Sequence, residues 1–101
     1  MATTAKTLFR GAASTTTTTT LYTVPASTTT IVSNIAVTNT TSTARTFTLT
    51  LDDVALHTTA EIGGLQTVYI DLKQTLGAAD TIKGGASATS VNFHICGIEI
   101  A

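Results

Sequence analysis

The chain has 101 residues and a net charge of −1, with five basic and six acidic side chains and a mean hydropathy of +0.34. Charged residues make up only 11% of the chain and aromatic residues 5%, whereas threonine, which favours strands, fills about a quarter of the positions. This composition excludes a coiled coil and a charge-driven disordered chain. No apolar run approaches the roughly 20 residues of a membrane-spanning helix.

The first predicted elements are an extended segment, a threonine run and a short strand. The extended segment covers residues 4–10 and contains two neighbouring large apolar residues. The six threonines of residues 15–20 include no large apolar residue, so we predict a linker or an exposed strand edge there. Residues 21–24 then form a short strand, which ends at Pro25 because proline has no N–H group to donate to a ladder.

Three longer segments alternate apolar and polar residues with a period of two, as half-buried strands do. They cover residues 30–39, 46–51 and 67–72. Asp52-Asp53 separates the second of them from another apolar segment, residues 54–56, and we predict a tight hairpin at this pair of aspartates.

The end of the chain contains two further predicted strands, residues 81–83 and residues 90–100. We predict turns with positive φ at Gly63-Gly64 and Gly84-Gly85. In the last strand, the apolar residues change phase after Gly97, which predicts a bulge or a change of sheet at this glycine.

The apolar positions of the alternating segments predict the hydrophobic core. These positions are Ile31, Ile35, Val37, Phe47, Leu49, Leu51, Val68, Ile70, Leu72, Val91, Phe93 and Ile95.

Eight or so short strands without a helical period predict an all-β fold with a single β-sandwich domain. We expect a jelly-roll-like strand order, with an immunoglobulin-like order as the alternative. Residues 1–20 are predicted to be an extended N-terminal arm and linker, and residues 21–101 the sandwich. Removal of residues 1–13 is then expected to leave a folded sandwich. The alternative is that residues 4–10 form an ordinary strand of the same subunit's sheet, in which case the truncated chain unfolds.

The sequence offers few groups for chemistry. His94 and Cys96 fall on the same face of the last strand, but a small thiol in a strand is most often simply packed. With His57 they match no metal-ligand spacing, and the acidic pair Asp52-Asp53 fits a turn better than acid–base work. We therefore expect no enzyme activity, no catalytic residue, no metal and no cofactor.

Partners and compartment are also constrained. Five scattered basic residues make no basic patch, so we expect no nucleic-acid partner. The N-terminal residues show no secretory signal pattern and no segment suits a membrane, so we expect synthesis in a cytoplasm.

Residues 21–40 have the sequence LYTVPASTTTIVSNIAVTNT, which resembles a turn-and-strand segment common in small virion proteins of tailed bacteriophages, although Ser27 stands where a turn glycine is commoner. AKTLFRG at residues 5–11 resembles their N-terminal arm, LTLDDVAL at residues 49–56 their hairpin, and VNFHICGIEI at residues 91–100 their last strand.

The resemblance implies a structural role in the virion. The function expected first is a capsid decoration (cement) protein, made in the host cytoplasm, that binds the major capsid protein as a symmetric oligomer, with a trimer expected first. The alternative is a tail, baseplate or fibre module that recognises a host-surface glycan. The residues expected to dock on a neighbouring subunit or on the shell are Lys6, Leu8, Phe9 and Arg10.

Overall fold

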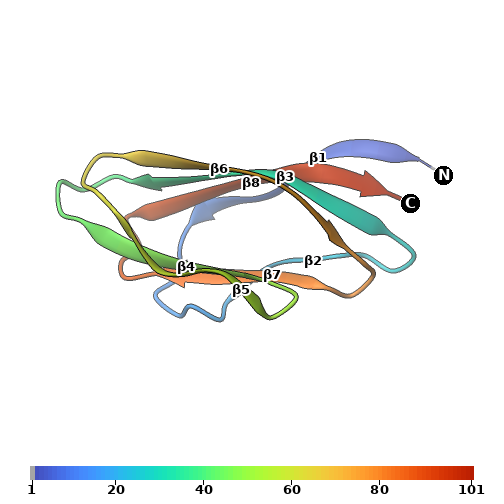
Figure 1. Cartoon of the computed structure of the whole chain (residues 1–101), viewed down its shortest axis with the longest axis horizontal. Helices are drawn as coiled ribbons and strands as arrows, with labels where there is room; N and C mark the ends of the chain where they lie inside the picture. The colour runs from blue at the N-terminus through green and yellow to red at the C-terminus, as the bar shows by residue number, and fades with distance from the viewer. Residues whose placement is uncertain (1) are drawn as a thin grey trace.

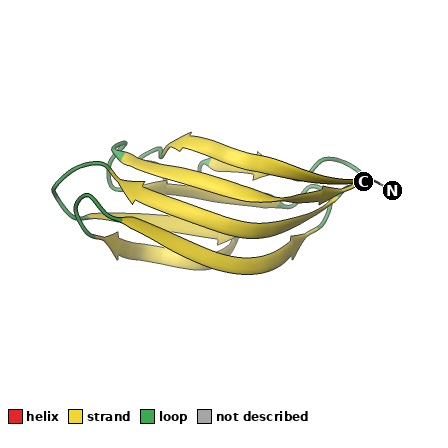
Figure 2. Ribbon diagram, turned by 90° about the horizontal axis from the view of Figure 1, so that it is seen from above, coloured by secondary structure: helices red, strands yellow, loops and turns green. Residues whose placement is uncertain are grey.

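The computed structural model describes residues 2–101, and every regular element in them is a strand (Figure 2). The alternation of apolar and polar residues with a period of two is the cause, because it gives each strand one face to bury. The strands are β1 (Thr3–Ala12), β2 (Thr20–Thr23), β3 (Thr29–Asn39), β4 (Arg45–Leu51), β5 (Val54–Ile62), β6 (Thr67–Leu76), β7 (Thr81–Ala86) and β8 (Val91–Ile100).

The strands form two antiparallel four-stranded sheets that lie face to face (Figure 1). The first sheet has the order β1-β8-β3-β6, and the second has the order β2-β7-β4-β5. β1 pairs with β8, β2 with β7, β3 with β6 and β4 with β5, so the chain is one long hairpin rolled up on itself. This order is that of a jelly roll, which confirms the first expectation and excludes the immunoglobulin-like order.

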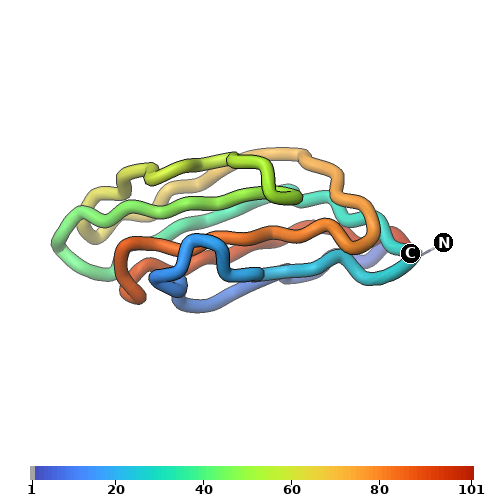
Figure 3. Tube along the Cα trace, turned by 90° about the horizontal axis from the view of Figure 1, so that it is seen from below, coloured from blue at the N-terminus to red at the C-terminus, as the bar shows by residue number. Residues whose placement is uncertain are grey.

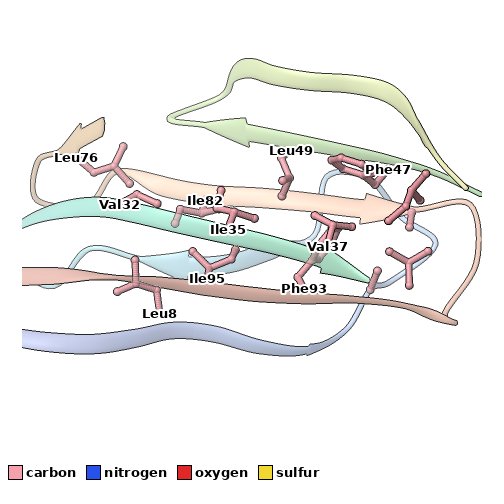
Figure 4. Packing of buried hydrophobic residues seen from close by; sticks show 14 of the residues in the cluster. Leu8, Val32, Ile35, Val37, Phe47, Leu49, Leu76, Ile82, Phe93 and Ile95 are labelled. Atoms are coloured by element: carbon pink, nitrogen blue, oxygen red, sulfur yellow. The ribbon is translucent and has the colours of Figure 1, made fainter. Parts of the chain in front are cut away.

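The core lies between the two sheets and includes much of the predicted set (Figure 4). Seven predicted residues are buried: Ile35, Val37, Phe47, Leu49, Val91, Phe93 and Ile95. Another four are half-buried and pack against this core: Leu51, Val68, Ile70 and Leu72. The prediction missed buried residues from the shorter or less regular segments: Leu8, Ala13, Val24, Val32, Ile62, Leu76, Ile82 and Ala86.

Ile31 is the predicted core residue whose register was wrong. It is half-buried, and its neighbour Val32 is fully buried in its place. The reason is a bulge between Val32 and Asn34, which shifts the inward phase of β3 by one residue.

The bulge predicted at Gly97 lies instead in the neighbouring strands. β8 keeps one phase through Gly97, whereas β1 and β3, on either side of it, are irregular at this level. A Cβ atom on Gly97 would lie 2.3 Å from the carbonyl oxygen of Ile31 and 3.0 Å from Leu8 Cδ1. The glycine therefore makes room for a bulged neighbour and for a core side chain.

The turns differ from the prediction in which residues take positive φ. Asp52 and Asp53 have φ of 51° and 60°, which confirms the tight hairpin between β4 and β5. Ser27 has φ of 57°, the left-handed conformation that explains why glycine is commoner at this place in the resembling segments. The positive φ expected at the two glycine pairs is wrong, because no described glycine adopts it.

Gly84 and Gly85 lie inside β7, where Gly84 makes room for Thr48 and Leu49 of β4 and Gly85 allows the threonine-rich loop to approach. The amide N–H of Gly84 donates to the carbonyl of Thr19, and that of Ala86 donates to the carbonyl of Ser14. In Figure 3 this loop, in blue, lies beside the orange end of β7. The predicted linker is thus a loop docked on the second sheet.

Replacing Gly85 with alanine should destabilise the fold by about 1–3 kcal/mol, because its Cβ would meet two backbone carbonyls. The clashes are with Thr16 O at 2.5 Å and Ser14 O at 2.7 Å. Urea unfolding measures the effect, and Gly77→Ala is the control because its nearest contact is Asp80 Oδ2 at 3.7 Å. Equal stability of the two variants would contradict the docking of the loop.

Asn39 is a buried polar residue that organises the loops at one end of the sandwich. Its amide nitrogen donates to the carbonyl of Thr43 at 2.8 Å, with longer bonds to Gly63 and Ile62 at 3.3 and 3.4 Å. Its amide oxygen accepts from the N–H and the hydroxyl of Thr41. The side chain thereby satisfies backbone groups that the strands leave unpaired.

Asn39→Asp should therefore lower the free energy of unfolding by about 1–3 kcal/mol or more at neutral pH. The carboxylate keeps the acceptors but cannot donate, so it faces the carbonyls without a hydrogen bond. The same change at Asn92, on the outward face of β8, should alter the free energy of unfolding by less than about 0.5 kcal/mol. A neutral Asn39→Asp would show that the amide donors contribute nothing.

Candidate interaction surfaces

The candidate chemical residues are spread over the two sheets. His94 and Cys96 lie on the outward face of β8 and are half-buried, whereas His57 on β5 packs against Phe47, with ring centroids 5.4 Å apart and ring planes tilted by 46°. Within residues 2–101 no group of three or more His, Cys, Asp or Glu side chains is placed to hold a metal ion.

Two carboxylates approach each other at one end of the sandwich. The negative charge of Asp80, more than any other cause, raises the pKa of Asp52 above its usual value. Asp80 also accepts a hydrogen bond from the amide of Gly77 at 2.8 Å, which closes the turn before β7. A shallow pocket of about 290 Å³ lies beside them, between the β4–β5 hairpin and the end of β6. The two acids thus belong to turns.

A second polar cluster lies where β1, β2, β3 and β8 meet. The hydroxyl of Tyr22 donates to the carboxylate of Glu99 and lies 2.9 Å from the hydroxyl of buried Thr30. Lys6 Nζ lies 3.2 Å from Glu99 Oε1. The hydrogen bond from Tyr22, followed by the contacts with Lys6, lowers the pKa of Glu99, although partial burial works in the other direction. Burial is the main cause that raises the pKa of Tyr22.

Glu99→Gln should reduce the loss of stability in acid. A carboxyl whose pKa is lowered by folding stabilises the protein above its unfolded pKa, about 4.3 for Glu, and this contribution disappears as the pH falls through the folded pKa. Urea midpoints between pH 7 and pH 3 measure it. Glu61→Gln, an exposed acid on β5, is the control and should keep the wild-type acid profile. Parallel profiles for all three proteins would contradict the role of Glu99.

The residues predicted to dock on a neighbour differ in their surroundings. Leu8 is only 7% exposed and packs into the core of its own chain, with Phe9 half-buried against it. The irregular register of β1 between Thr7 and Phe9 places these consecutive residues against the same core. Lys6 is paired with Glu99, while Arg10 is exposed. β1 itself is an edge strand of the sheet; its role as a docking arm stays a prediction, as does the division at residue 20.

The outward face of the first sheet has an exposed aromatic ring, and the charged residues of this sheet lie on the edge strands β1 and β6 and near the end of β8. Arg10, His94, Ala36 and Tyr69 form one row across its four strands. Tyr69 is 72% exposed. Tyr69 alternates with the inward residues Val68 and Ile70, and this alternation is the signal in the sequence for its exposure.

Comparison with known proteins gives structural similarity only. No protein-family model matches the sequence, and no curated protein matches it. Two solved structures of a pentameric capsid protein isolated from metagenomic phage sequences are similar to it, each with a TM-score of 0.45 and at 17% and 21% identity. The matches cover 92% of this chain and 59% and 60% of theirs, so the chain spans about three-fifths of their length. None of residues 2–101 lies in a helix long and apolar enough to cross a membrane.

Proposed function

We propose that this chain is a capsid decoration protein of a tailed bacteriophage, which binds the major capsid protein on the outer shell as a symmetric oligomer. The observation that carries the proposal is the segment of residues 21–40, which resembles a segment of small phage virion proteins. In the structure this segment is one unit: β2, a turn at Pro25 and Ser27, and β3. It joins the two sheets of the jelly roll.

The sparsely charged surface of the protein suits contact with the shell. Charged residues make up only 11% of the chain, so little has to be desolvated when such a surface is covered. A subunit that binds the mature shell and not its separated parts stabilises the shell by its binding free energy. Repetition over many sites on one particle multiplies this gain.

Binding to purified, undecorated capsids tests the proposal. The protein should sediment with mature capsids and raise the temperature at which they release their genome. Failure of the wild-type protein to bind any capsid form contradicts the proposal.

The second candidate function is recognition of a host-surface glycan by a tail, baseplate or fibre module. Exposed Tyr69 favours it, because sugar rings stack on aromatic faces, and the hydrogen-bonded pair of Asn34 and Asp71 lies beside it. Under this hypothesis the protein binds host cells instead of capsids, and Tyr69→Ala abolishes that binding. Tyr22, the other tyrosine, is held by Glu99 and Thr30.

A further inference from the structure

The two edges of the first sheet are β1 and β6, which carry complementary groups. Both strands have ten residues and contain no proline. An edge strand presents a row of unpaired N–H and C=O groups, which another chain can pair with. We propose that β6 of one copy pairs with β1 of the next, so that the first sheet continues from subunit to subunit in a closed ring. This contact extends the proposed function, and the inference rests on that function because a decoration protein is proposed to bind as a symmetric oligomer.

Strand direction permits this contact. Each neighbouring pair in the order β1-β8-β3-β6 is antiparallel, so β1 and β6 run in opposite directions. A copy rotated about an axis along the strands keeps its strand directions, and its β1 therefore meets β6 antiparallel. The same contact repeats at every subunit, as in a cyclic oligomer whose two contacting patches differ.

The backbone groups at both edges also point the right way. The amide of Ala13 donates to the carbonyl of Val91, and alternate residues of an antiparallel strand point their N–H and C=O groups to opposite sides. Ala12 and Arg10 therefore turn theirs toward the free edge of β1. At the other edge, the amide of Asn39 on β3 donates to the carbonyl of Gln66, which immediately precedes β6. The same alternation then turns the backbone groups of Tyr69 and Asp71 toward the free edge of β6.

Side chains then select the register. Arg10 and Tyr69 belong to the same outward row, so continuing the rows places Arg10 of one copy opposite Tyr69 of the next and diagonal to Asp71. A shift of two residues places it opposite Asp71, whereas a shift of one would turn its side chain to the other face. A guanidinium stacks on a phenol ring and pairs with a carboxylate in either register.

Both charged groups are available for this contact. Arg10 is exposed, and residues 2–101 give its guanidinium no salt-bridge partner. The Asp71 carboxylate accepts a hydrogen bond from Asn34 at 3.3 Å, and among the same residues no cation pairs with it. The β1 strand contains Lys6 and Arg10 and no acid, while β6 on the opposite edge contains one acid, Asp71, and one base, Lys73.

Cysteine cross-linking in solution, without capsids, tests the contact. In a Cys96→Ser background, Arg10→Cys combined with Tyr69→Cys or with Asp71→Cys should form disulfides between chains on oxidation. Within one chain the two edges lie three strand spacings, about 14 Å, apart, beyond the roughly 7 Å that a disulfide spans. Non-reducing gels should show covalent oligomers up to one closed species, and native mass spectrometry should give the same subunit number for the wild type. A trimer is expected, and a pentamer is among the other closed rings that this measurement identifies.

Matched controls decide between head-to-tail and symmetric edge contacts. Arg10→Cys alone and Tyr69→Cys alone, both in the Cys96→Ser background, should stay uncross-linked, as should Arg10→Cys with Glu61→Cys on the edge of the other sheet. Arg10→Glu and Asp71→Arg should each reduce association at least tenfold, and the double variant should restore it. Covalent dimers from a single-cysteine variant, or a wild-type protein that is monomeric at millimolar concentration, overturn the inference.

The outcomes separate this inference from the proposed function. Rings that cross-link as expected but bind no capsid overturn the function and leave the contact standing. Capsid binding by chains whose paired cysteines never cross-link overturns the contact and leaves the function standing.

Discussion

Replacing Phe47 with alanine should lower the free energy of unfolding by about 3–5 kcal/mol, a large part of the stability of a small domain. Phe47 is 2% exposed and lies between the sheets. Its ring meets Phe93 of the first sheet edge to face, with centroids 6.3 Å apart, and His57 of its own sheet. Truncation therefore removes a contact across the sandwich and leaves a cavity that surrounding strands cannot fill without distortion.

Urea unfolding followed by circular dichroism measures this loss. Val54→Ala is a control of the same kind, because Val54 is apolar but 68% exposed, and its free energy of unfolding should change by less than about 0.5 kcal/mol. A loss below about 1 kcal/mol for Phe47→Ala would contradict the position of this ring in the core.

The sequence predicted the fold well where each strand alternates without interruption. Residues 46–51 show this: Phe47 and Leu49 are buried, Leu51 packs against the core, and the threonines between them point away. The turn at Asp52-Asp53 was equally readable, because two turn residues stand between two apolar segments. Together these local patterns were enough for a sandwich.

Bulges are what the pattern could not place. Ile31 and Ser33 lie four and two residues before Ile35, so a regular strand would place all three on one face, and only the neighbouring strands reveal the shift. Gly97 gave a real signal of irregularity, but the sequence could not assign it to β1 and β3 instead of β8. Register between strands depends on contacts far apart in the chain, which periodicity within one segment does not contain.

The candidate surface was predicted less well, for a related reason. Leu8 and Phe9 were read as anchors for a neighbour because a flexible, threonine-rich segment follows them. That segment packs on β7 through backbone hydrogen bonds, which cannot be predicted from its threonine side chains. Arg10 remains exposed, and its proposed partner Tyr69 lies 59 residues away in the sequence, on the other edge of the sheet, a relation that only the strand order defines.

Deleting residues 1–13 should destabilise the chain by several kcal/mol, and we expect the truncated protein to be largely unfolded at 37 °C. This reverses the expectation from sequence. The deletion removes β1, its ladder with β8, and the buried side chain of Leu8, whose burial alone is worth about 1.5–3 kcal/mol. It also removes Lys6, which pairs with Glu99, and leaves β8 as an unprotected edge. A domain with a total stability of about 5–15 kcal/mol tolerates little of this.

Two point variants separate the role of β1 in the fold from its role as an edge. Leu8→Ala should lower the free energy of unfolding by about 2–5 kcal/mol without directly removing the proposed contact between copies. Arg10→Ala should leave stability within about 0.5 kcal/mol and weaken the oligomer. Circular dichroism and thermal unfolding of the truncated chain give the decisive measurement. If it keeps a cooperative transition near that of the full chain, residues 1–13 are a detachable arm, and their packing on β8 contributes little to the fold.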